Sequence, residues 1–152
     1  MANSNSPYGF RPYSQQDGGV GSVCDTVTLA SGVGCKPGDI LTLASGYCSL
    51  IGATGTSADF VAQGYVTAAA GEQQKVSALP LYPGVKLRFQ TSTLSAGNVG
   101  TAYDIVPTTG AGYLNTGATS YAQITIDDLA PGSAYGQYAE ALGHVVKGRF
   151  VD

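Results

Sequence analysis

The chain has 152 residues, a length that suits one domain with its own hydrophobic core. Charged residues make up only 11% of it, against about 25% in ordinary domains, and the net charge is −3. The seven Lys and Arg residues form no cluster and no apolar run approaches the roughly 18 residues of a membrane helix, so we expect neither a nucleic-acid nor a membrane partner.

The first residues, MANSNSPYGFRP, are predicted to form an extended arm. Proline fixes φ, lacks an N–H and keeps the residue before it extended, so this segment suits neither a helix nor a central strand. Its aromatic and cationic side chains would suit contact with another protein, although a frayed terminus is the plain alternative. We assign residues 1–20 to the arm and 21–152 to a glycine-rich β domain. The candidate contact residues are Pro7, Tyr8, Phe10, Arg11, Pro12 and Tyr13.

The rest of the chain shows period-two alternation interrupted by glycine, which is typical of short strands. Gly64 lies inside one of these strands and indicates a bulge or a close backbone approach. Residues 79–84 are interpreted as a stiff, extended connection. The stretch 108–119 is rich in glycine and threonine, with Tyr113 and Leu114 as isolated apolar anchors, and 134–142 is expected to form one turn or a loop rather than a long helix. The expected strands are 23–29, 39–43, 47–51, 60–68, 85–91, 102–106, 121–126 and 144–151.

Many short strands separated by turns predict an all-β fold, here a single small β-barrel or β-sandwich domain with an extended N-terminal arm. In 85–91, Val85, Leu87 and Phe89 are expected to face inward and Lys86, Arg88 and Gln90 outward. Ten tyrosines in a weakly charged chain favour contact surfaces, because Tyr offers a large area at low entropic cost.

The cysteines predict neither a zinc site nor a disulfide framework. No two of Cys24, Cys35 and Cys48 form a C-x-x-C motif, and the single histidine, His144, is far from them in the sequence. Their odd number and the lack of a visible secretory signal favour reduced thiols in a protein made in the cytoplasm. Most should be buried as small hydrophobic side chains, and a Cys24–Cys35 bridge stays open.

No motif predicts catalysis, a cofactor or a metal. The sequence has one histidine, no G-x-S-x-G around a serine and no Gly-Lys pair for a phosphate loop. Asp127 and Asp128 are adjacent, so on a strand they would face opposite sides, and Asp before a turn normally caps backbone N–H groups. We therefore expect no catalytic, cofactor-binding or metal residues, and a protein that is not an enzyme.

The chain resembles the small capsid decoration (cement) proteins of tailed bacteriophages. The resemblance rests on Met1-Ala2-Asn3, on PYGFRP at 7–12 and on Gly38-Asp39-Ile40-Leu41. Further likeness lies in the glycine-centred run 60–66, in VGTAYDIV at 99–106 and in the closing segment 142–151. The polar insert that many relatives carry before the Phe-containing strand is shortened here to about 71–85.

This resemblance implies a structural virion protein that decorates and stabilises the assembled head by clamping neighbouring major capsid protein subunits. The expected partners are the major capsid protein and the chain itself, as a homotrimer or alternatively a dimer. The protein would be made in the host cytoplasm and end on the outer surface of the capsid. The alternatives are a carbohydrate-binding or other adhesion β module of a virion or host surface, and, third, a glycan hydrolase.

Overall fold

The computed structural model describes residues 3–5, 7–13 and 24–149. They form strands and one 3-10 turn, η1 (Ala96–Asn98), without an α-helix, so the all-β prediction is confirmed. The strands are β1 (Arg11–Pro12), β2 (Asp25–Thr28), β3 (Ile40–Ala44), β4 (Tyr47–Leu50), β5 (Phe60–Ala62), β6 (Lys75–Pro80), β7 (Lys86–Gln90), β8 (Thr93–Leu94), β9 (Ala102–Val106), β10 (Tyr113–Asn115), β11 (Ile124–Leu129), β12 (Gly136–Gln137) and β13 (Glu140–Val145).

The larger sheet has the order β1-β7-β13-β11-β9-β10 and is antiparallel throughout. It curls back on itself, because the Ser92 N–H just after β7 donates to the Leu114 carbonyl of β10 at 2.9 Å. Alternation along β7 places Leu87 and Phe89 inside and Lys86 and Arg88 on the outer face. The short pair β12–β8 lies beside this sheet.

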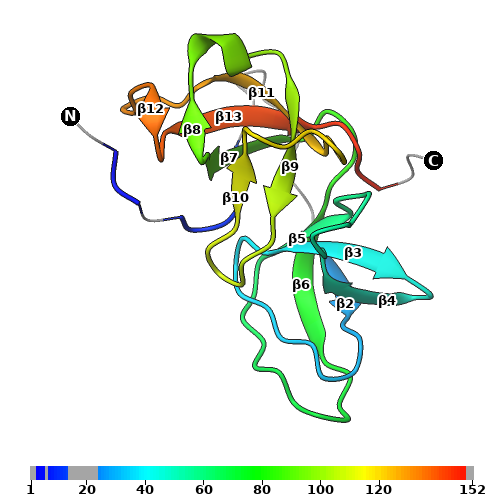
Figure 1. Ribbon diagram of the computed structural model, residues 1–152. Coiled ribbons are helices and arrows are strands. Elements are labelled where there is room, and N and C mark those ends of the chain that lie inside the picture. The colour runs from blue at the N-terminus through cyan, green and yellow to red at the C-terminus, as the bar shows by residue number, and fades with distance from the viewer. Residues whose placement is uncertain (1–2, 6, 14–23, 150–152) are drawn as a thin grey trace.

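The second sheet has the order β2-β6-β5-β3-β4 and curls in the same way. Its two ends meet where the Ala30 N–H donates to the Cys48 carbonyl at 2.8 Å. Apolar residues occupy both faces of its strands: Val61 of β5 packs toward the first sheet, while Phe60 and Ala62 fill the interior of the curl. Figure 1 shows this sheet below the first, with the N-terminal arm running toward their junction.

One continuous core joins the two sheets. Phe89, Ile105 and Ile124 of the first sheet belong to the same buried cluster as Ile40 and Val61 of the second. The segment after β13 also ties the sheets together: the Arg149 N–H donates to the Leu81 carbonyl at 2.7 Å, and the Lys147 carbonyl accepts from the Ala58 N–H at 2.8 Å. A Cβ at Gly148 would lie 2.1 Å from the Leu81 oxygen, so only glycine fits at this crossing.

Most expected strands are present with shifted ends, and the exceptions have local causes. The expected strand 60–68 ends at Ala62, because the chain changes partner and Val66 exchanges two hydrogen bonds with Cys35. Gly64 does lie at a close approach, since a Cβ there would be 3.1 Å from Val76 Cγ2. The expected connection 79–84 begins inside strand β6, where Pro80 occupies the last position.

The expectation of one turn or a loop over 134–142 was only partly right. There is a turn at Tyr138, but the segment also holds β12 and the start of β13, and the glycine- and threonine-rich stretch 108–119 contains strand β10. Gly136 and Tyr138 have φ values of 136° and 57°, which are incompatible with a helix. Gln90 lies on the outer face of β7 as expected, but it is buried there because the arm covers it. The expected strand residues Val23, Phe150 and Val151 lie outside the described residues.

Candidate functional site

The PYGFRP segment is fastened to its own domain through Phe10. The Phe10 ring is 1% exposed and its centroid lies 5.4 Å from that of Phe89 in the shared core. The Phe10 N–H donates to the Gly38 carbonyl at 2.9 Å. Gly9, at φ 81°, lets the backbones touch, because a Cβ there would lie 2.6 Å from the Gly38 oxygen. The aromatic side chain predicted as an outward anchor therefore fills the interior, driven there by apolar burial.

The loop that receives Phe10 is held in place by a buried carboxylate. Asp39 accepts hydrogen bonds from the Lys36 N–H at 2.8 Å and the Gly110 N–H at 2.6 Å. Burial raises the pKa of Asp39, while these two backbone donors and the Lys36 charge act in the opposite direction. Asp39 thus joins the loop before β3 to the loop before β10, and Gly38 next to it meets the arm.

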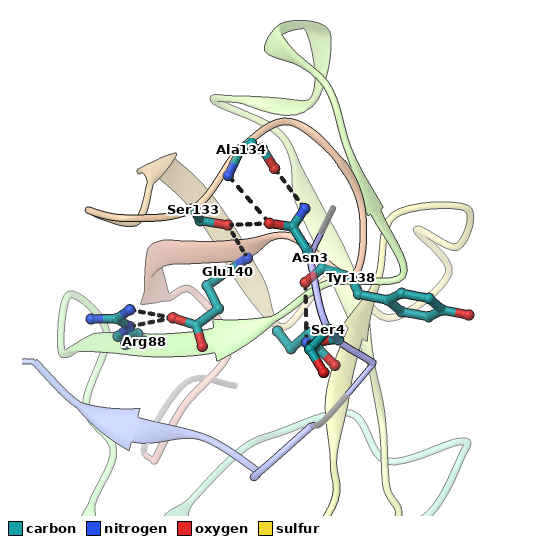
Figure 2. A network of polar contacts seen from close by, with 8 residues as sticks. Asn3, Ser4, Arg88, Ser133, Ala134, Tyr138 and Glu140 are labelled. Carbon is teal, nitrogen blue, oxygen red and sulfur yellow. Dashed lines mark hydrogen bonds and ion pairs between the residues drawn. The ribbon is translucent and has the colours of Figure 1, made fainter. Parts of the chain in front are cut away.

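The beginning of the arm is fastened separately, through Asn3 (Figure 2). Its side-chain NH2 donates to the Ala134 carbonyl at 2.8 Å and to the Gln137 carbonyl at 3.0 Å. Its side-chain oxygen accepts from Ser133 Oγ and the Ala134 N–H, both at 3.3 Å. The Ser133 hydroxyl in turn accepts from the Glu140 N–H at 2.9 Å, so the network reaches strand β13.

Gln90 on β7 supports the same stretch of arm. Its side-chain NH2 donates to the Ser4 carbonyl at 2.8 Å and to the Tyr138 carbonyl at 3.0 Å. Asn3 and Gln90 were not among the predicted site residues. Asn3 and Ala134 are separated by 131 positions, and nothing in the local sequence of either indicates their contact.

Tyr8 and Arg11 form the outer surface of the docked arm. The Arg11 guanidinium lies 4.2 Å from the centre of the Tyr8 ring, a cation–π contact. Tyr8 also meets the Arg88–Glu140 ion pair, in which Arg88 donates through Nε and a terminal nitrogen to Glu140 Oε2. Burial raises the pKa of the Tyr8 hydroxyl, and the Glu140 charge adds to this. The hydrogen bond that Arg88 donates to Glu140 is the main reason that the pKa of Arg88 is raised.

The predicted contact residues thus divide into two groups. Arg11 and Pro12 are exposed, Pro7, Tyr8 and Tyr13 are partly exposed, and Phe10 belongs to the core. In this conformation Phe10 has almost no exposed surface, and it fixes the position of its neighbours in the arm. The part of the arm assigned to 14–20 lies outside the described residues.

The free edge of β1 has few donors for an additional strand. The Tyr13 N–H donates to the Lys86 carbonyl at 2.9 Å, so the backbone N–H and C=O groups of odd-numbered arm residues point toward β7 and those of even-numbered residues point toward the free edge. Of these even-numbered residues, Phe10 already donates its N–H to Gly38, and Pro12 has no N–H to donate. Proline at an edge commonly prevents strand addition. The side chains of the docked arm are therefore better suited to contact than its backbone edge.

Two clefts border the arm. One, of about 610 Å³, lies between Asn3, Tyr8 and the 131–134 loop and has the Arg88–Glu140 pair on its wall. The other, of about 370 Å³, is lined by Asn5 and Pro7 of the arm and by the tyrosines Tyr113 and Tyr138. Figure 2 shows the Tyr138 ring directed away from the Arg88–Glu140 pair.

Other titratable side chains form separate local pairs. His144 Nδ1 lies 2.7 Å from Asp127 Oδ1 across β13 and β11, a pair that the sequence did not predict. A bulge in β11 between Ile126 and Asp128 accommodates Asp127. Cys35 and Cys48 are buried as expected, and Cys24 is exposed, all three as free thiols. Within the described residues, no three His, Cys, Asp or Glu side chains gather to hold a metal ion.

The described segments contain no helix long and apolar enough to cross a membrane. Comparison of the chain with protein-family models, with curated proteins and with solved structures finds no match in any of the three.

Proposed function

We propose that this chain is a structural virion protein that decorates the outer surface of an assembled phage head and stabilises it by clamping neighbouring major capsid protein subunits. The observation that carries the proposal is the docked arm. It is fixed from inside by Phe10 and at its start by Asn3, and it presents Tyr8, Arg11, Pro12 and Tyr13 at the edge of the larger sheet. A contact surface that is ordered before binding loses less conformational entropy on association.

The composition and the sequence resemblance support the same role. A weakly charged, tyrosine-rich chain suits a protein that is surrounded by neighbours. Many copies on one shell would let a modest contact per copy add up through avidity. Self-association as a trimer, or alternatively a dimer, belongs to this proposal, because closed symmetry is the usual form of homo-oligomers.

The test is co-sedimentation with purified, expanded heads that lack this protein, from the phage that produces it. The wild-type chain should pellet with the heads and raise the temperature at which they break. Tyr13→Ala should weaken binding, whereas Tyr65→Ala, at a residue that is 64% exposed in the segment after β5, should not. Wild-type protein that stays in the supernatant at all concentrations would contradict the proposal.

Deletion of the whole arm is a poor test of contact. It would remove Phe10 from the core, so lost binding could reflect lost folding instead of a lost interface. Substitution of exposed arm residues avoids this ambiguity.

A carbohydrate-binding module is the second candidate, favoured by the cleft of about 370 Å³ that Tyr113 and Tyr138 line. Aromatic rings with polar neighbours in a concave site are typical of small-ligand binding. A glycan array that shows binding abolished by Tyr113→Ala or Tyr138→Ala, together with no binding to heads, would favour this function over decoration.

A further inference from the structure

Three cations lie side by side on the outer face of the arm and the strand it pairs with. Arg11 of β1 is directly opposite Arg88 of β7, and Lys86 is two residues before Arg88 on the same face. These three residues, called the basic strip below, are three of the seven Lys and Arg in a chain of net charge −3. Like charges directly opposite each other destabilise a sheet, so folding alone does not explain the arrangement.

The counter-charges within the described chain do not neutralise the basic strip. Arg88 pairs with Glu140, but the ion pairs among the described residues include neither Arg11 nor Lys86. His144 is Lys86's neighbour in the register, and it is bound to Asp127. Asp127 and Asp128 belong to β11, two strands and roughly 10 Å away from β7.

Two of the three cations in the basic strip are held in position. Arg11 is held over Tyr8, the backbone on either side of it is fixed by the Phe10–Gly38 and Tyr13–Lys86 hydrogen bonds, and Arg88 is oriented by Glu140. Arg11, which is held in place and forms no ion pair with the described carboxylates, is ready to receive one from outside, since little ordering remains to be done on binding.

We propose that the basic strip binds carboxylate side chains on the surface of a partner protein. This inference rests on the proposed function: the partner is the major capsid protein, and the strip specifies that its contact region carries Asp or Glu. Three cations, with Asp127 and Asp128 two strands away on β11, form a short, bounded patch, which fits a few carboxylates better than a long polyphosphate backbone. Electrostatic complementarity of this kind speeds association and fixes the orientation of docking.

The experiment compares Lys86→Glu with Lys75→Glu in the head co-sedimentation assay at several salt concentrations. Both lysines are exposed first residues of strands, Lys86 of β7 and Lys75 of β6, so the variants change the net charge equally. Lys86→Glu should weaken binding at low salt roughly tenfold or more and reduce its dependence on salt, while Lys75→Glu should stay within about twofold of wild type. Arg11→Gln is the second variant, with a smaller loss in the same direction.

The outcomes separate the two proposals. In one outcome the wild-type chain binds heads, and Lys86→Glu and Arg11→Gln bind them equally well and with the same salt dependence. That result would overturn the proposed role of the basic strip and leave the proposed function standing. Equal losses in Lys86→Glu and Lys75→Glu would also overturn it, because only net charge would then matter. No binding by the wild-type chain would overturn the proposed function and this inference with it. Circular dichroism of each variant confirms that it is folded.

Discussion

Gly9 and Gly38 lie so close that a side chain on either would collide with the backbone of the facing segment. A Cβ on Gly9 would be 2.6 Å from the Gly38 oxygen, and one on Gly38 would be 2.9 Å from the Tyr8 oxygen. Both residues also have positive φ, 81° and 91°. At the residue scale, the position of the arm therefore depends on these two glycines and on the buried ring of Phe10, which packs against Phe89.

Gly9→Ala should destabilise the protein by more than Gly46→Ala. Both glycines have positive φ, 81° and 84°, so alanine meets the same backbone strain of roughly 1 kcal/mol at each. A Cβ at Gly46 contacts nothing within 4 Å, while at Gly9 it collides with Gly38. Urea unfolding of the two variants measures the difference, and equal losses would show that the arm is not docked at Gly38.

The two buried thiols should make the protein less stable in alkali. Burial raises the pKa of Cys35 and of Cys48 from 9.0 to about 11. The folded chain then retains protons that the unfolded chain loses, so the free energy of unfolding falls as pH rises from about 9 through about 11. Urea unfolding across this range should show a steeper decline for wild type than for the Cys35→Ala/Cys48→Ala variant; parallel curves would contradict this.

At the element scale, strands with clean alternation could be predicted from sequence and segments with special backbone angles could not. β7 and β9 follow from alternating side chains, because one face of each strand is buried. The spacing of Tyr135, Tyr138 and Leu142 imitates a helix, but positive φ at Gly136 and Tyr138 produces β12 and a turn. Long-range packing decides the conformation of such segments, and the local sequence pattern carries no information about that packing.

The arm shows the same division. Its extended form follows from the prolines, and residues 11–12 do form a strand. That Phe10 anchors the arm to its own domain could not be deduced, because Phe89 and Gly38 are brought there by the fold. The contact of Asn3 with the 133–137 loop is also a product of the tertiary structure alone.

Asn3→Ala should loosen the beginning of the arm while leaving Phe10 in place. The substitution removes the hydrogen bonds to Ser133, Ala134 and Gln137, a loss of about 1 kcal/mol for a partly exposed group. Asn5→Ala is the matched control, since Asn5 is exposed and its side chain makes no hydrogen bond with the described residues. Hydrogen–deuterium exchange at the Ala134 amide should rise in the first variant only; unchanged protection there would contradict the contact.

At the scale of the whole molecule, two curled sheets share a core and carry the arm across one outer face. The C-terminal segment ties the sheets together through Leu81 and Ala58, and the arm does so through Phe10 and Gly38. The two sheets should consequently unfold together, and the face formed by β1, β7 and β13 should keep its shape on binding. Such a rigid face suits repeated attachment to a large assembly, as the proposed function requires.

The most direct test of this proposal is a cryo-electron microscopy map of heads incubated with the purified chain. The map should show the protein on the outer surface, bridging neighbouring major capsid protein subunits, with the β1–β7 face and Arg11 turned toward them. Heads that remain bare at saturating protein, or a bound chain whose β1–β7 face points to solvent, would contradict it.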